Sequence, residues 1–259
     1  MAQNNQAKQT LADDYQKEMG HWNATLQYLV EHDENFFEIY KTFVTIPYKN
    51  NGLDAKTREL LQVALSASPT SLHKETLEIH MRNAIAQGAT EQEIFEVLKV
   101  VSVLGVHTCA VGVPILVEEL GKDQEHPKEW TDSQSKRKAK FIETMGYWNA
   151  FRETLLDNDE HFFDSYYDYL TDPWHSDILS PKLKEFIYIA IDSSTTHLFE
   201  AGIRVHIRNA LKYGATFEEI MEVYKLTSAQ GVNTFYVGIP ILQSILSEMR
   251  EGNPKNESD

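Results

Sequence analysis

The chain repeats itself at an offset of 126 residues, and this internal repeat constrains its fold more than any other feature. The segment MGHWNA at 19–24 recurs as MGYWNA at 145–150, and 56–116 shares 27 of 61 residues with 182–242 without a gap. An ungapped repeat keeps helix and loop lengths equal in the two copies. We therefore expect two homologous domains, one over 1–126 and one over 127–259.

Each copy has the periodicity of helices. Thr90 and Glu93 are spaced as a capping box, and the apolar residues after them recur every three or four positions, as does the pattern that begins at Thr216. The apolar runs 58–67 and 184–193 would also suit buried strands. No hairpin turn signals flank them, so we interpret them as buried helices. The sequence thus predicts an all-α fold built by tandem duplication.

Three segments lack an apolar pattern, and we interpret them as the linker between the two copies and the two terminal tails. The polar stretch 121–140, which contains Pro127, is predicted to link the two copies. Residues 1–9 and 252–259 are predicted to be loose tails.

Composition limits the classes of partner. The chain has 24 Lys and Arg against 39 Asp and Glu, and its formal charge of −15 repels phosphate backbones, so we expect no nucleic acid partner. The single cysteine, Cys109, cannot close an intrachain disulfide or form a thiolate metal cage. The N-terminal segment has no apolar signal-peptide core, and Gly and Pro interrupt the later apolar runs. We expect a cytoplasmic protein that does not enter the membrane.

Two polar pairs survive the duplication while their apolar neighbours are exchanged. His80 matches His206, and Glu59 matches Glu185 near the start of an apolar helix. An imidazole titrates near neutral pH, which makes each histidine a candidate general acid or base. A carboxylate beside it would fix the tautomer and raise the pKa of the ring. A hydrogen-bonded core histidine and a first-turn glutamate that complements the helix dipole are the structural alternatives.

Other positions differ between the copies. His107 and Asn233 follow the same Gly-Val pair, so two cavities at these loops would differ chemically. Cys109 matches Phe235, which favours a small buried hydrophobe over a nucleophile.

A metal site is not expected from the sequence. His73, His80 and Glu59 could be drawn as a triad of ligands, but the second copy has Phe199 in place of His73.

The repeated pattern resembles the carboxymuconolactone decarboxylase family, which includes the alkylhydroperoxidase AhpD-like proteins. The matching elements in the first copy, all repeated in the second, are Lys56–Leu60, His80–Ile85, Gly88–Thr90, Glu93-Ile94, Glu96–Leu98 and Gly105-Val106. The resemblance implies an all-α fold whose small subunits form dimers arranged into trimers. The tandem chain would then be a pseudo-two-fold dimer in one polypeptide, and a homotrimer would form a pseudo-hexameric ring.

The resemblance also bears on the reaction. The CxxC cysteines of the peroxidase branch correspond here to His73 and Thr76, and in the second copy to Phe199 and Gly202, so disulfide chemistry is not expected. By the resemblance, His80, His206, Glu59 and Glu185 are the catalytic residues.

We therefore expect a cofactor-independent lyase that acts on a small lactone or carboxylate compound by histidine acid–base catalysis. No cofactor is needed when the lactone itself accepts electrons. The substrate-binding candidates are Arg82, Arg208, His107 and Asn233, with an arginine holding the anion if its side chain reaches the cleft. The alternatives are a non-catalytic oligomeric ligand-binding or assembly module and a degenerate AhpD-like peroxidase without the redox cysteines.

Overall fold

The computed structural model describes residues 2–49, 52–121 and 129–251, and these ranges contain helices and no strand. The first copy comprises α1 (Ala2–Met19), α2 (Ala24–His32), α3 (Glu34–Lys49), α4 (Ala55–Ala67), α5 (Lys74–Ala86), α6 (Glu91–Ser102), η1 (Val103–Val106) and α7 (His107–Glu119). The second copy comprises α8 (Asp132–Met145), α9 (Phe151–Asn158), α10 (Glu160–Thr171), η2 (Asp172–His175), α11 (Pro181–Asp192), α12 (Glu200–Lys212), α13 (Phe217–Ser228), η3 (Ala229–Val232) and α14 (Asn233–Glu251). The all-α prediction is confirmed. The predicted domain boundary at 126 lies outside the described residues.

Local signals place the helix ends where the sequence predicts them. Thr90 and Thr216 each accept a hydrogen bond from the backbone of the glutamate three residues on, and that glutamate accepts one from the threonine backbone, so both capping boxes form. The two ambiguous apolar runs are helical, within α4 and α11, and nearly every residue in them is buried. Burial on all sides explains why neither run shows a clear period.

Two expectations about irregular segments are wrong. Residues 132–140 of the predicted linker belong to α8. A further capping box, between Thr131 and Gln134, begins this helix, and Phe141 on it is fully buried. Residues 2–9 of the predicted N-terminal tail belong to α1. Isolated polar helical turns carry little apolar signal, and packing of the remainder of each helix stabilises them. Residues 122–128 and 252–259 lie outside the described residues.

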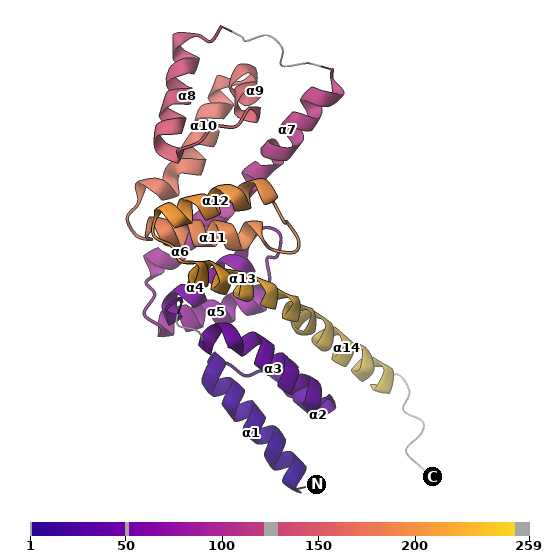
Figure 1. Cartoon of the computed structure of the whole chain (residues 1–259). Helices are drawn as coiled ribbons and strands as arrows, with labels where there is room; N and C mark the ends of the chain where they lie inside the picture. Colours follow the sequence, from indigo (N-terminus) through magenta and orange to yellow (C-terminus); the bar gives the residue numbers. More distant parts are fainter. Residues whose placement is uncertain (1, 50–51, 122–128, 252–259) are drawn as a thin grey trace.

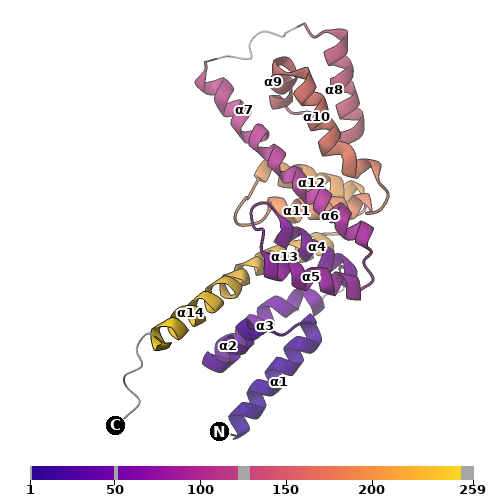
Figure 2. The same ribbon diagram turned by 180° about the vertical axis from the view of Figure 1, so that it is seen from behind.

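The two copies share a central apolar core. It is formed by α4, α5 and α6 of the first copy with α11, α12 and α13 of the second. Figures 1 and 2 show this group in the middle of an elongated molecule, with α8–α10 at one end and α1–α3 at the other. The chain is therefore a pseudo-two-fold dimer within one polypeptide.

The helices that follow the central core cross over between the copies. α7 of the first copy packs on α9 of the second, and α14 of the second copy packs on α2 of the first. The apolar cluster at each end consequently contains residues of both copies; Val103 and Val106 join the cluster of α8–α10, and Ala229 and Ile239 join that of α1–α3. This exchange brings the ends of α6 and α13 next to the opposite copy.

Candidate functional site

A histidine and a glutamate meet in each copy. His80 on α5 places Nδ1 2.8 Å from Oε2 of Glu59 on α4, and His206 on α12 places Nδ1 2.6 Å from Oε2 of Glu185 on α11. All four residues are buried. A carboxylate at Nδ1 holds the proton there and orients the ring, which leaves Nε2 as the atom that can exchange a proton with a ligand.

Each histidine lines a cavity that both copies build. The second-copy cavity, defined by His206, has a volume of about 60 Å³ and is also lined by His107 and Ala110 from α7 of the first copy. The first-copy cavity, defined by His80, has about 40 Å³ and is also lined by Asn233 and Tyr236 from α14 of the second copy. A volume of 60 Å³ corresponds to roughly four or five water molecules, so either cavity suits a compact ligand.

Arg152 distinguishes the second-copy cavity. This arginine on α9 lines the cavity, and only 4% of its surface is exposed. Its guanidinium lies over the rings of Phe141 and Phe151, both at 4.5 Å, and over Tyr147 at 5.0 Å. Among the described residues no carboxylate lies within ion-pair distance of it, and its Nε atom has no hydrogen-bond partner. The first copy has Leu26 at the matching position.

A buried positive charge without a counter-ion is costly to maintain, and it attracts an anion. Burial raises the pKa of the neighbouring Tyr166 to about 12, so this phenol stays protonated and can donate a hydrogen bond to the same anion. The second-copy cavity therefore combines a fixed cation, a neutral donor and an imidazole.

Asp192 adds a buried carboxylate beside this cavity. Its side chain is fully buried at the end of α11, and Oδ2 lies 3.9 Å from Nε2 of His206. Burial raises the pKa of Asp192 to about 7. Burial lowers the pKa of His107 to about 3, and it also lowers the pKa of His197. Both of these imidazoles are consequently neutral at neutral pH.

The first-copy cavity is lined by hydroxyl groups instead. Nε2 of His21 lies 3.1 Å from the hydroxyl of Tyr236, and Nδ1 lies 3.1 Å from the backbone carbonyl of Met19. Burial lowers the pKa of His21 to about 4. Tyr236 is the counterpart of Ala110 in the repeat. Its larger side chain fills space in the first-copy cavity that Ala110 leaves free in the second-copy cavity. This cavity has no counterpart of Arg152 or Asp192, because Leu26 and Ser66 stand at those positions.

The arginines expected to bind substrate lie elsewhere. Arg82 is exposed and binds Glu78 one turn away on the same helix, and Arg208 is exposed as well. Neither lines the two cavities. On α5 and α12 the face one turn from the histidine points into the core, so both arginines point to solvent.

The two loop residues, His107 and Asn233, do line cavities, but each lines the cavity of the opposite copy. His107 places Nδ1 2.9 Å from Nε2 of His197, a residue 90 positions later. The exchange of α7 and α14 produces this arrangement.

Sequence reasoning missed Arg152, Asp192 and His197. All three are absent from the first copy, where Leu26, Ser66 and Ser71 occupy the matching positions, so a search for residues shared by both copies passes over them. The signal available was a charged residue inside an otherwise apolar run, as with Asp192 after FIYIAI.

Comparison with known proteins agrees with this architecture. The sequence profile of the carboxymuconolactone decarboxylase family matches the chain twice, over residues 34–108 and 160–240. The fold is similar to that of a crystal structure from Burkholderia xenovorans, provisionally described as a gamma-carboxymuconolactone decarboxylase subunit, with a TM-score of 0.87 and 38% identity over 93% of this chain and 98% of that chain. A comparison with curated proteins found no match. The resemblance seen in the sequence and its tandem arrangement are confirmed.

Proposed function

Because the chain belongs to the carboxymuconolactone decarboxylase family, we propose that it is a lyase that removes carbon dioxide from a small lactone or related compound bearing carboxylates. The reaction takes place in the second-copy cavity. The observation that carries this proposal is that His206, held by Glu185 at 2.6 Å, lines the same cavity as Arg152, a cation with no carboxylate within ion-pair distance among the described residues.

Arg152 binds an anionic group of the substrate that remains after the reaction. A charge-assisted hydrogen bond from a guanidinium to a carboxylate is short and directional, so this contact orients the compound in the cavity. The remaining walls include Val103, Leu104 and Leu170. A carboxylate placed against such apolar side chains loses its solvation, and this favours its conversion to neutral carbon dioxide.

His206 supplies the proton. When the bond between the ring carbon and the carboxylate breaks, its electron pair stays on that carbon and is delocalised toward the lactone carbonyl. The protonated imidazole then transfers a proton to the carbon, and water later returns one proton to the ring. Glu185 fixes the orientation of the ring through Nδ1 and stabilises the positive charge that the imidazolium carries. The electrons stay within the substrate, so no redox cofactor is required.

Release of carbon dioxide from a panel of small lactone carboxylates tests the proposal. The chain with His206→Gln should lose activity by about 10²–10⁴-fold, the usual contribution of a positioned acid or base. His80→Gln is the matched control, since it alters the same pair in the first-copy cavity and should leave most activity intact. Activity that survives His206→Gln, or that only His80→Gln removes, would contradict the proposal.

Assembly into a trimeric ring is the second part of the proposal. The stretch 91–119 is long and apolar enough to cross a membrane by length and composition, a test that core helices of soluble proteins also pass. Its α6 portion packs in the central core, whereas α7 and α14 expose apolar side chains at matching positions. These side chains are Val111, Ile115, Leu116 and Leu120 on α7, and Val237, Ile241, Leu242 and Leu246 on α14.

Equivalent faces on both copies suit a closed ring, in which each chain presents the same surface twice. Light scattering after size exclusion should give the mass of three chains, and Ile241→Glu should lower it. Ile85→Glu, at an exposed apolar residue on α5, is the control that should not. A monomer at all concentrations would contradict the ring. A cytoplasmic location stays a prediction.

A further inference from the structure

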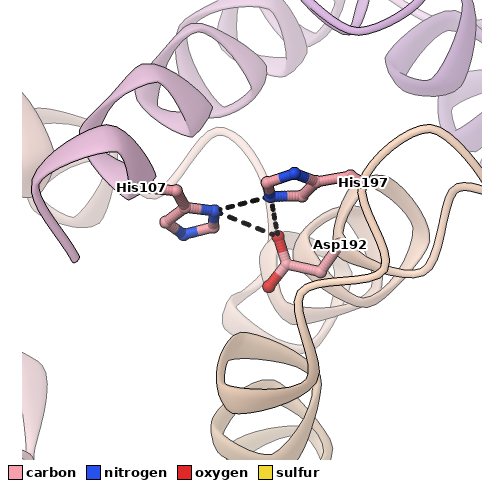
Figure 3. A group of neighbouring side chains, drawn as sticks. All are labelled: His107, Asp192 and His197. Carbon is pink, nitrogen blue, oxygen red and sulfur yellow. Dashed lines mark hydrogen bonds and ion pairs between the residues drawn. The ribbon is translucent and has the colours of Figure 1, made fainter. Parts of the chain in front are cut away.

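Three side chains from distant parts of the sequence converge beside the second-copy cavity. His107 begins α7, Asp192 ends α11, and His197 lies in the turn before α12 (Figure 3). The Nδ1 atom of His107 lies 2.9 Å from Nε2 of His197 and 3.7 Å from Oδ1 of Asp192, and Nε2 of His197 lies 4.0 Å from the same oxygen. In Figure 3 these three atoms point toward a common centre.

We propose that His107, Asp192 and His197 bind a divalent transition-metal ion of the zinc type. A triangle with sides of 2.9, 3.7 and 4.0 Å has a circumscribed circle of about 2.1 Å radius, so a single point lies at that distance from all three atoms. Zinc lies about 2.0–2.2 Å from imidazole nitrogen and carboxylate oxygen. Two imidazoles and a carboxylate are also the ligand types that such ions prefer.

The carboxylate of Asp192 is itself suited to hold a cation. Asp192 is completely buried, and neither of its oxygens has a hydrogen-bond partner among the described residues. A buried carboxylate in that state is costly unless it takes up a proton or binds a positive charge. Imidazoles lie near both of its oxygens: Nε2 of His206 is 3.9 Å from Oδ2, and His107 and His197 lie near Oδ1.

The backbone around the cluster is built for this carboxylate. A Cβ atom on Gly202 would overlap Oδ2 of Asp192, so the carboxylate fits only because residue 202 is glycine. The turn between α11 and α12 is closed by a hydrogen bond of 2.9 Å from the amide of Phe199 to the carbonyl of Asp192, which holds His197 next to α11. In the first copy Ser66 and Thr76 stand at the positions of Asp192 and Gly202, and their hydroxyl oxygens lie 3.0 Å apart in a hydrogen bond.

The complete donor set exists beside the second-copy cavity and is not repeated beside the first-copy cavity. The counterparts of His107, Asp192 and His197 in the internal repeat are Asn233, Ser66 and Ser71, in that order. Three protein ligands leave at least one coordination position for water or a ligand, as in catalytic rather than structural sites. His107 also lines the second-copy cavity, so the cluster lies at the wall of the cavity that Arg152 lines. The metal site does not depend on the proposed decarboxylation. It departs from the expectation of no metal, which considered only His73, His80 and Glu59.

Titration of the full, tag-free chain with Co²⁺ tests the site through the visible absorption of the bound ion, and competition with Zn²⁺ tests its preference. We expect about one ion per chain. His197→Ser and Asp192→Ser, which introduce the residues of the first copy, should each weaken binding at least about 100-fold. Gly202→Ala should do the same by displacing Asp192.

His73→Phe is the matched control, because it removes an imidazole from the equivalent turn of the first copy and introduces the residue of the second. It should leave the spectrum and affinity unchanged. Circular dichroism establishes that every variant is folded. The proposal is overturned if the wild-type chain binds no Co²⁺ or Zn²⁺, or if folded His197→Ser and Asp192→Ser variants bind as tightly as the wild type.

Discussion

Arg58 donates a hydrogen bond from Nη1 to Oε1 of Glu222 over 3.0 Å, across the junction between the two copies. Both side chains are buried. The other carboxylate oxygen accepts hydrogen bonds from the backbone amides of Gly52 and Leu53, at 3.2 and 3.3 Å. The duplicate contact joins Lys184 to Glu96 at 3.1 Å. Charged residues that repeat in the sequence thus bind the opposite copy, and they help to define how the copies pack.

Breaking the junction pair should strongly destabilise the chain. Glu222→Ala leaves Arg58 buried without its carboxylate, and the loss of one partner of a buried pair costs about 3–5 kcal/mol. Urea denaturation measures the free energy of unfolding. Glu78→Ala is the control, because it breaks the exposed pair with Arg82, which solvent screens, and should change stability little. Equal effects of the two substitutions would contradict this role of Glu222.

Glu185 should act on the reaction through His206. Glu185→Gln keeps the shape of the side chain but removes the charge that stabilises the imidazolium, so we expect kcat to fall about 10–100-fold with little change in KM. Steady-state kinetics measures kcat and KM separately, and a purely structural role would instead lower the melting temperature. Glu59→Gln in the first copy should leave kcat unchanged. An unaltered kcat in Glu185→Gln would argue against this positioning role.

Arg152 should contribute to binding at the expense of stability. Arg152→Leu, which introduces the residue of the first copy, should raise KM for an anionic substrate by about 10–100-fold, since a charged hydrogen bond contributes about 1.5–3 kcal/mol. The same change removes a buried charge without a carboxylate partner, so the melting temperature should stay the same or rise. Arg82→Leu should leave KM as it is. A lower melting temperature with unchanged KM would identify Arg152 as a structural residue.

His21 should make the stability of the chain depend on pH. Burial lowers its pKa from 6.5 to about 4, so the unfolded chain binds a proton at this residue more readily than the folded chain. The stabilisation is present in full above pH 6.5 and is lost as the pH falls from 6.5 toward 4. The groups within hydrogen-bond distance of the ring are the hydroxyls of Tyr15 and Tyr236 and the carbonyl of Met19. His80 and Glu59 act on it electrostatically.

His21→Gln keeps a hydrogen-bonding side chain but does not titrate. Between pH 6.5 and 4 its free energy of unfolding should fall less steeply than that of the wild type, by up to about 1.4 kcal/mol per pH unit, the slope for one proton. Chemical denaturation at a series of pH values measures both slopes. Parallel curves for the two proteins would show that His21 does not titrate differently on unfolding.

The local structure and the duplication could both be predicted from the amino-acid sequence. A capping box such as that of Thr90 and Glu93 involves residues three positions apart, and an apolar stripe with helical spacing is formed within one segment. Both features can therefore be recognised from the sequence. The ungapped repeat predicted two copies of one fold and singled out His80, His206, Glu59 and Glu185. The pairing of each histidine with its glutamate needed only the contact between consecutive helices.

Which copy completes each cavity depends on how the helices pack in three dimensions, and the sequence does not reveal it. α7 and α14 are apolar helices whose sequences do not indicate their packing partner, and burial of apolar surface is non-directional. Their exchange between the copies brought His107 to His197 and Asp192, and placed Asn233 beside His80. Arg152 also lines the second-copy cavity. The residues next to it in the sequence do not indicate that its side chain is buried there, because this depends on the packing around it.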